Sequence, residues 1–125
     1  MRFYCTDDTV DLEQYPYHVR DVHISDPFIL ADPKSRCYYT YVQFADTKRF
    51  PDVETDKEHG VFYVLESKDL IHWSKPQICF RQNNFWADKD YWAPEVHIWK
   101  GRYYLFSSFR ADGHYRKCQC LVSDS

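Results

Sequence analysis

The chain has 125 residues, of which 44% are hydrophobic and 19% aromatic, and its 16 basic and 19 acidic side chains give a formal charge of −3. This length suits one ordinary domain with a core. No basic block supports nucleic-acid binding, and no apolar run is long enough to cross a bilayer.

The N-terminal segment is polar and irregular, and we expect residues 1–22 to form an extended arm. Its first eight residues contain no apolar signal-peptide stretch, so the sequence predicts a cytoplasmic location. The five cysteines are scattered and lack the paired spacing of a zinc site. We expect them to be reduced thiols that pack as small hydrophobic side chains.

Short apolar and aromatic runs follow the arm, and turn residues separate most of them, whereas helical periodicity is nearly absent. This spacing predicts an all-β domain. Residues 45–59 are charged and contain a proline, which is typical of a long exposed loop. The predicted strands are 27–30, 37–44, 61–66, 77–80, 95–99, 102–109 and 118–123.

The two halves of the sequence repeat one another. Pro27 matches Pro94, and the pair Tyr38-Tyr39 matches Tyr103-Tyr104 within a unit of strand, turn, strand, loop, strand. The first unit adds a fourth strand, and a repeated four-stranded meander is the unit of a β-propeller.

The sequence therefore predicts a partial β-propeller of about two blades, with blade 1 at residues 23–82 and an incomplete blade 2 at 83–125. We expect this pair of blades to be a fragment of a longer domain. The alternative is self-association through its open blade edges, because unpaired strand edges readily pair with other chains.

Asp26 stands directly before Pro27 at the start of the first strand. An aspartate before a proline often begins a turn, which is the simpler interpretation. The repeat offers another one, because the matching position in the second unit is Ala93, so the turn itself needs no carboxylate. The first strand of a blade lies nearest the central channel, where a carboxylate can face a pocket.

The stretches ISDPFIL, YYTY, VLESKDLIHW, FWADKDYWAPEVHIWKGRYYLF and CLVSDS cover most of residues 23–125. In this order they resemble the N-terminal part of glycoside hydrolase family 43, five-bladed propellers that cleave arabinose- and xylose-containing glycans. The resemblance implies that Asp26 is the general base of an inverting glycosidase and takes a proton from the attacking water. It also implies that the general acid and the aspartate that tunes its pKa lie beyond residue 125, so we expect the chain alone to be inactive.

Five further residues are candidates for contacts with the sugar. Trp92, Trp86 and Phe85 have the flat apolar faces that stack on sugar rings, although packing between blades explains each of them slightly better. By the resemblance, Glu95 lines the pocket. His97 lies two residues further along the same strand face, and we expect a hydrogen-bonded channel residue there.

The resemblance implies that some relatives carry calcium or a similar ion in the channel. Its ligands would come partly from later blades, so no cofactor and no metal ligand is assigned to this chain. The expected partner is an arabinose- or xylose-containing glycan, without nucleic acid or membrane. Two other functions stay open: a carbohydrate-binding module without catalysis, and a truncated propeller fragment.

Overall fold

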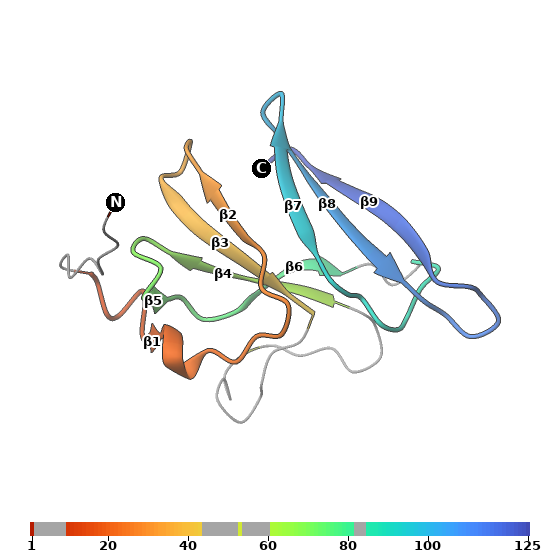
Figure 1. Ribbon diagram of the computed structural model, residues 1–125, viewed down its shortest axis with the longest axis horizontal. Helices are drawn as coiled ribbons and strands as arrows, with labels where there is room; N and C mark the ends of the chain where they lie inside the picture. The colour runs from red at the N-terminus through yellow and green to blue at the C-terminus, as the bar shows by residue number, and fades with distance from the viewer. Residues whose placement is uncertain (2–9, 44–52, 54–60, 82–84) are drawn as a thin grey trace.

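The computed structural model describes residues 1, 10–43, 53, 61–81 and 85–125, and these form an all-β structure of two antiparallel sheets (Figure 1). The predicted all-β class is confirmed. Within the described residues the helical structure is one short 3₁₀ turn, η1 (Val19–Asp21), and no helix has the length and apolar character needed to cross a membrane.

The first sheet is built on the meander predicted for blade 1. Neighbouring strands along the chain pair in order, with Leu30 opposite Tyr39, Tyr39 opposite Glu66, and Phe62 opposite Phe80. A register shift between Phe62 and Tyr63 marks an irregularity where the last strand pairs. The strands of the meander are β2 (Ile29–Asp32), β3 (Cys37–Val42), β4 (Val61–Ser67) and β6 (Gln77–Arg81).

The end of the N-terminal segment belongs to this sheet and is not the extended arm that its polar composition predicts. Strand β1 (Tyr17–His18) pairs with β5 (His72–Trp73), which in turn pairs with β4. Tyr15 is fully buried, and its hydroxyl donates a hydrogen bond of 2.5 Å to Glu66. The segment folds back because its few apolar side chains cover one face of the sheet.

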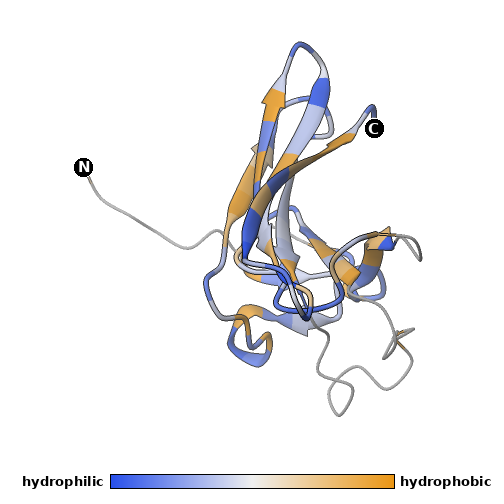
Figure 2. Ribbon diagram, turned by 90° about the vertical axis from the view of Figure 1, so that its right-hand side faces the viewer, coloured by the Kyte–Doolittle hydropathy of each residue, from blue (hydrophilic) through white to orange (hydrophobic). Residues whose placement is uncertain are grey.

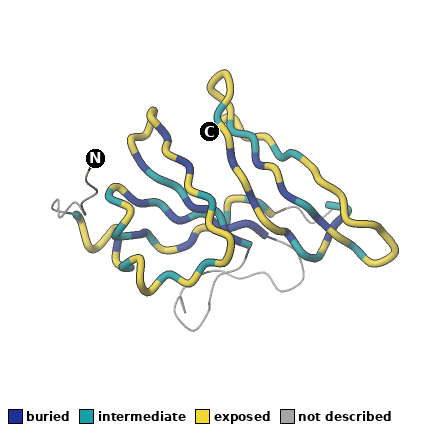
Figure 3. The backbone as a smooth tube through the Cα atoms, viewed as in Figure 1, coloured by how far each residue is buried: buried dark blue, intermediate teal, exposed yellow. Residues whose placement is uncertain are grey.

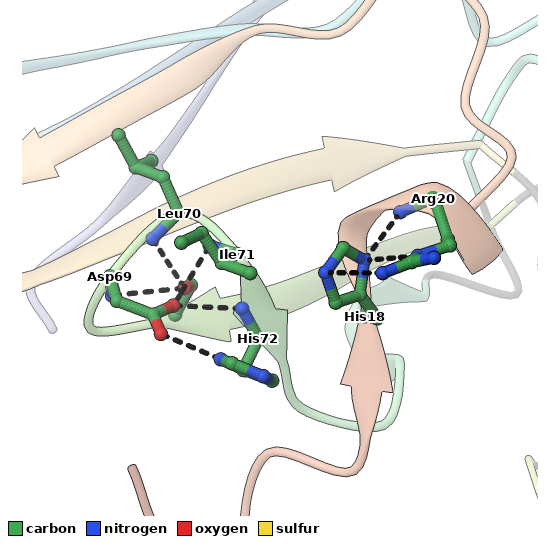
Figure 4. Close-up of polar contacts among 7 residues, drawn as sticks. His18, Arg20, Asp69, Leu70, Ile71 and His72 are labelled. Atoms are coloured by element: carbon green, nitrogen blue, oxygen red, sulfur yellow. Dashed lines mark hydrogen bonds and ion pairs between the residues drawn. The ribbon is translucent and has the colours of Figure 1, made fainter. Parts of the chain in front are cut away.

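The loop between β4 and β5 is held by one carboxylate, Asp69 (Figure 4). Its Oδ1 atom accepts hydrogen bonds from the backbone N–H groups of Ile71 (2.8 Å) and His72 (2.7 Å), and its Oδ2 atom lies 2.7 Å from Nδ1 of His72. Ser67 adds a hydroxyl that accepts from the backbone of Leu70. These bonds satisfy backbone groups that a tight loop would otherwise leave unpaired.

The second sheet is the shorter meander of blade 2, with strands β7 (Glu95–Trp99), β8 (Arg102–Phe109) and β9 (Lys117–Ser123) in that order. Gly101 in the first turn has φ 75° and Gly113 in the second has φ 76°, a conformation that glycine adopts without steric cost. Val96, Leu105 and Leu121 lie opposite one another, so they share the face that points toward the first sheet.

The main core lies between the two sheets (Figure 3). Phe62 from the first sheet and Phe109 from the second are both fully buried, with ring centroids 6.0 Å apart. Asp32 is buried beside this core, and it accepts a hydrogen bond of 2.9 Å from the hydroxyl of Tyr103. This bond and the aromatic contacts join the blades.

A second core covers the other face of the first sheet, where Tyr17, Val22 and Ile24 pack against it. Its buried members are Val42, Val61, Tyr63, Leu65 and Trp73. Hydrophobic segments lie mainly on the strands, as Figure 2 shows. The outer face of the second sheet has no such cover in the described structure, and Trp99, Phe106 and Val122 are exposed there.

The structure tests the predicted loop and the predicted packing of the cysteines only in part. The loop predicted at residues 45–59 lies almost wholly outside the described residues, as does Cys5. The four described cysteines are free thiols. Cys37 is buried and Cys120 half-buried, whereas Cys79 and Cys118 are exposed on the edge strands β6 and β9.

Candidate active site

A pocket of about 220 Å³ lies between the two sheets, where the segment that leads into β2 faces the segment that leads into β7. Asp26 lines it from the first segment, and Trp92 and Ala93 line it from the second. The sequence repeat matches Asp26 with Ala93, and the fold brings these two positions to one pocket. His23 and Tyr41 are also among its lining residues.

A larger cavity of about 300 Å³ separates the sheets elsewhere. Apolar side chains such as Phe80 and Leu121 line most of it, and its buried carboxylate, Asp32, is already bound to the backbone of Lys34 and to Tyr103. Burial alone would raise the pKa of Asp32, but these hydrogen bonds outweigh it and hold the pKa below its usual value. The smaller pocket is the better candidate site because its carboxylate is not engaged in this way.

Asp26 combines a left-handed backbone with an exposed side chain. Its φ of 52° is a conformation that aspartate tolerates better than most residues. The positive φ does not mark function by itself, since Leu70 and Lys100 share it at turns. Among the described residues, no hydrogen bond or ion pair holds the Asp26 carboxylate, so its oxygens are open to a ligand or water in the pocket.

Asp90 provides the contrast, because it has the same φ of 52° and a purely structural set of partners. Its Oδ2 atom lies 3.1 Å from Nε of Arg110 and 3.1 Å from Nη2 of Arg116. The two aspartates have the same backbone conformation, but only Asp90 is bound to cations of the described chain. The Asp26 carboxylate has no such partner among the described residues.

Trp92 stands at the pocket with 46% of its surface exposed. Its backbone is fixed, because its N–H donates to the carbonyls of Asp90 (3.0 Å) and Ser108 (3.2 Å), and its carbonyl accepts from the Ser108 hydroxyl (2.5 Å). An exposed indole on a fixed backbone is a surface on which a sugar ring can stack.

Glu95 and His97 lie on one face of β7, as predicted, with the buried Val96 on the other. The Oε1 atom of Glu95 is 2.5 Å from Nε2 of His97, and both side chains are more than half exposed. Phe28 from the first sheet approaches His97, with ring centroids 5.7 Å apart. Neither Glu95 nor His97 is among the described residues that line the Asp26 pocket, so their contact with sugar stays a prediction.

Phe85 and Trp86 lie in the aromatic core between the sheets. The ring of Phe85 lies 5.0 Å from that of Phe109, and the Trp86 indole donates a hydrogen bond of 2.8 Å to Gln119. The described lining of the Asp26 pocket includes neither residue. The structure thus shows Phe85 and Trp86 in the packing role that was one of the two interpretations of the sequence. Contact of these two residues with sugar also stays a prediction.

The described residues contain no group of three or more His, Cys, Asp or Glu side chains placed to hold a metal ion. His23 and Asp26 in the pocket are two potential ligands, too few for a metal site. The described residues therefore do not fit a complete channel-ion site.

Comparison with known proteins decides the family. The model of glycosyl hydrolases family 43 matches residues 18–125. The chain belongs to this family. A search of curated protein sequences gives no match.

Solved structures agree with this membership. An endo-arabinase from Bacteroides thetaiotaomicron is 34% identical with a TM-score of 0.72, and the match covers 89% of this chain and 34% of that one. A family 43 endo-arabinanase from Bacillus licheniformis, at 22% identity and a TM-score of 0.57, matches over 82% of this chain and 33% of its own. The protein RS223, a β-xylosidase, has 14% identity, a TM-score of 0.61, and coverage of 87% and 35%.

The first of these structures supports the predicted partial propeller, and the other two show the shared fold. The family 43 chain spans about a third of the length of each of these proteins.

Several residues in or near the pocket were not among the site residues predicted from the sequence of this family 43 chain. His23 precedes the first predicted strand and Tyr41 lies within the second, and no local pattern marks either of them as a pocket residue. Burial raises the pKa of Tyr41 above its ordinary value, so its phenol stays protonated. Arg116 lies beyond a predicted hairpin turn, and only the pairing of β8 with β9 brings it to Asp90.

Proposed function

We propose that this family 43 chain supplies the general-base side of an inverting glycoside hydrolase that acts on arabinofuranosyl- or xylosyl-containing glycans. Asp26 is the base, and it takes a proton from the water that attacks the anomeric carbon. The observation that carries the proposal is the Asp26 carboxylate, free of partners among the described residues, in a pocket shared with the exposed Trp92.

Inversion needs a second carboxyl group at a distance, roughly 6.5–9.5 Å from the base, so that a water molecule fits between them. Asp26 is the one carboxylate among the described residues that line the pocket. We assign the general acid to residues outside this chain, as the resemblance implies, and the length of the similar enzymes supports this assignment. The chain alone then binds glycan without cleaving it.

A chimera tests the catalytic role. Residues 18–125 replace the matching third of the Bacteroides endo-arabinase, which supplies the remaining blades. We expect the chimera to hydrolyse linear arabinan and Asp26→Asn to lower kcat by about a hundred- to ten-thousand-fold, which is the usual contribution of a general base. The matched control is Asp112→Asn on the exposed β8–β9 hairpin, which leaves kcat unchanged.

Three outcomes would contradict the proposal. Full activity of the folded Asp26→Asn chimera would remove Asp26 from the chemistry. A folded chimera that binds arabinan but does not cleave it would favour the carbohydrate-binding module. Hydrolysis by the 125-residue chain alone, abolished by Asp26→Asn, would instead show that the general acid lies within it.

A further inference from the structure

Trp92 is covered on one face by a cation. The guanidinium carbon of Arg116 lies 4.3 Å from the centroid of the Trp92 ring. An arginine plane stacks well on an indole, because the guanidinium is flat and weakly hydrated and the ring face is electronegative. This contact comes from the start of β9, far along the chain from Trp92.

Arg116 is itself held in place by three hydrogen bonds. Nη1 donates to the carbonyl of Asp90 (3.0 Å) and to the hydroxyl of Ser108 (2.9 Å), and Nη2 donates to Oδ2 of Asp90 (3.1 Å). Asp90 and Ser108 also bind the backbone of Trp92. The same two residues therefore bind both the backbone of Trp92 and the cation that covers its ring.

Trp92 keeps exposed surface although Arg116 contacts one face of its ring. One ring face is contacted by Arg116, and 46% of the residue surface is still open, so Trp92 keeps surface for a ligand away from Arg116. Trp92 also lines the pocket of Asp26. An indole that is stacked against a hydrogen-bonded guanidinium loses less conformational entropy when a ligand binds to its open surface.

We propose that Arg116 is a positioning residue that fixes Trp92 as a one-sided stacking platform for a neutral pentose ring in the Asp26 pocket. The proposal rests on the proposed function of that pocket. Arg116 touches the indole and acts on the sugar only through it. Arg110 keeps Asp90 paired when Arg116 is replaced, so the loop that carries Trp92 retains an ion pair.

A second cation over a tryptophan supplies a matched control. Nζ of Lys100 lies 5.7 Å from the ring centroid of Trp99, which is 64% exposed at the turn between β7 and β8. Trp99 is not among the described residues of the Asp26 pocket. Arg116→Gln and Lys100→Gln each remove one cation from one exposed indole and introduce the same side chain.

The test is titration of the chain with arabinotriose and with xylotriose, followed at the indole N–H signals by NMR. We expect the Trp92 signal to shift, and Arg116→Gln to weaken binding about five- to tenfold, in the range of an exposed to partly buried cation–π contact. Arg116→Lys recovers part of the loss because it keeps the charge but not the flat stack. Lys100→Gln leaves the affinity within about twofold.

In the chimera, Arg116→Gln raises KM and leaves kcat nearly unchanged, which is the signature of lost uniform binding, whereas Asp26→Asn lowers kcat. If the unchanged chain binds neither trisaccharide, the proposed function and this role both fail. If it binds one of them and Arg116→Gln leaves the affinity within twofold, the role of Arg116 alone is overturned. Should Arg116→Gln unfold, an Arg116→Lys affinity equal to that of the unchanged chain overturns this role.

Discussion

The two sheets repeat one strand pattern, but they are buried differently. The first sheet is covered on both faces, by the second sheet on one side and by residues from the N-terminal segment, such as Tyr17 and Val22, on the other. The second sheet buries Val96 and Leu105 on its inner face, while Trp99 and Phe106 remain exposed on its outer face.

The same strand pattern therefore forms a sheet that is covered on both faces and a sheet that is covered on one face only. In the second sheet, stability depends on one interface, the core shared with the first sheet. The same interface forms the pocket, because Asp26 comes from one side and Trp92 from the other. Packing between the blades and the geometry of the site are therefore coupled.

The largest expected effect comes from breaking the shared core. Phe109→Ala removes a fully buried ring that contacts Phe62 and Tyr91, and a change of this kind costs about 3–5 kcal/mol. Phe106→Ala is the matched control on the opposite face of the same strand, where the ring is 42% exposed, and it costs less than about 1 kcal/mol. Denaturant unfolding measures both, and equal losses would show that the two faces of β8 are equally buried.

A smaller effect distinguishes the carboxylates of the two sheets. Burial alone would raise the pKa of Asp69, but hydrogen bonds from His72, Ile71 and Ser67 outweigh it and lower the pKa below its usual value. A carboxyl group of this kind stabilises the fold above its unfolded-state pKa, near 3.9, and the contribution is lost as the pH falls through the lower folded-state pKa.

Asp69→Asn therefore destabilises the chain at pH 7, by about 1–3 kcal/mol, and flattens the loss of stability in acid. Asp112→Asn in the second sheet is the control. Lys89 lowers the pKa of Asp112, but this pair is exposed, so we expect no measurable change in unfolding. Unfolding curves from pH 7 down to pH 2 test both variants. An unchanged acid transition in Asp69→Asn would contradict the stabilising role of the Asp69 carboxylate.

The hydrogen bond between the sheets gives the smallest effect. Tyr103→Phe removes the donor to buried Asp32, which keeps its bond from the backbone of Lys34, and we expect a loss of about 1–2 kcal/mol. Tyr115→Phe, at a residue 93% exposed, should change stability by less than about 0.5 kcal/mol. Thermal unfolding compares them, and identical midpoints would mean that the Tyr103 bond adds nothing.

Much of the fold follows from local sequence. The prediction of residues 102–109 as a strand coincides with β8, because alternation and the flanking Lys100-Gly101 turn define it. The first strand was predicted at 27–30 but is Ile29–Asp32, since Pro27 has no N–H to pair and the Asp32 side chain closes the next turn. Strands β1 and β5 were missed because two residues carry no periodic signal.

The candidate site is less accessible to sequence reasoning. The repeat and the family resemblance single out Asp26, and its flat apolar face makes Trp92 a candidate for stacking on a sugar. The contact of Arg116 with Trp92 depends on where the β8–β9 hairpin ends and on the ion pair with Asp90. These are tertiary relations between segments far apart in the chain, and no local spacing encodes them.

The central claim is that one glycan pocket lies between the sheets and takes residues from both. A titration of the 125-residue chain with arabinotriose, followed at all backbone amide signals, tests it most directly. The account predicts that shifts concentrate at Ser25 and Asp26 on one side and at Ala93 on the other, with one shared dissociation constant. Shifts confined to the outer face of the second sheet, around Trp99 and Phe106, would contradict it.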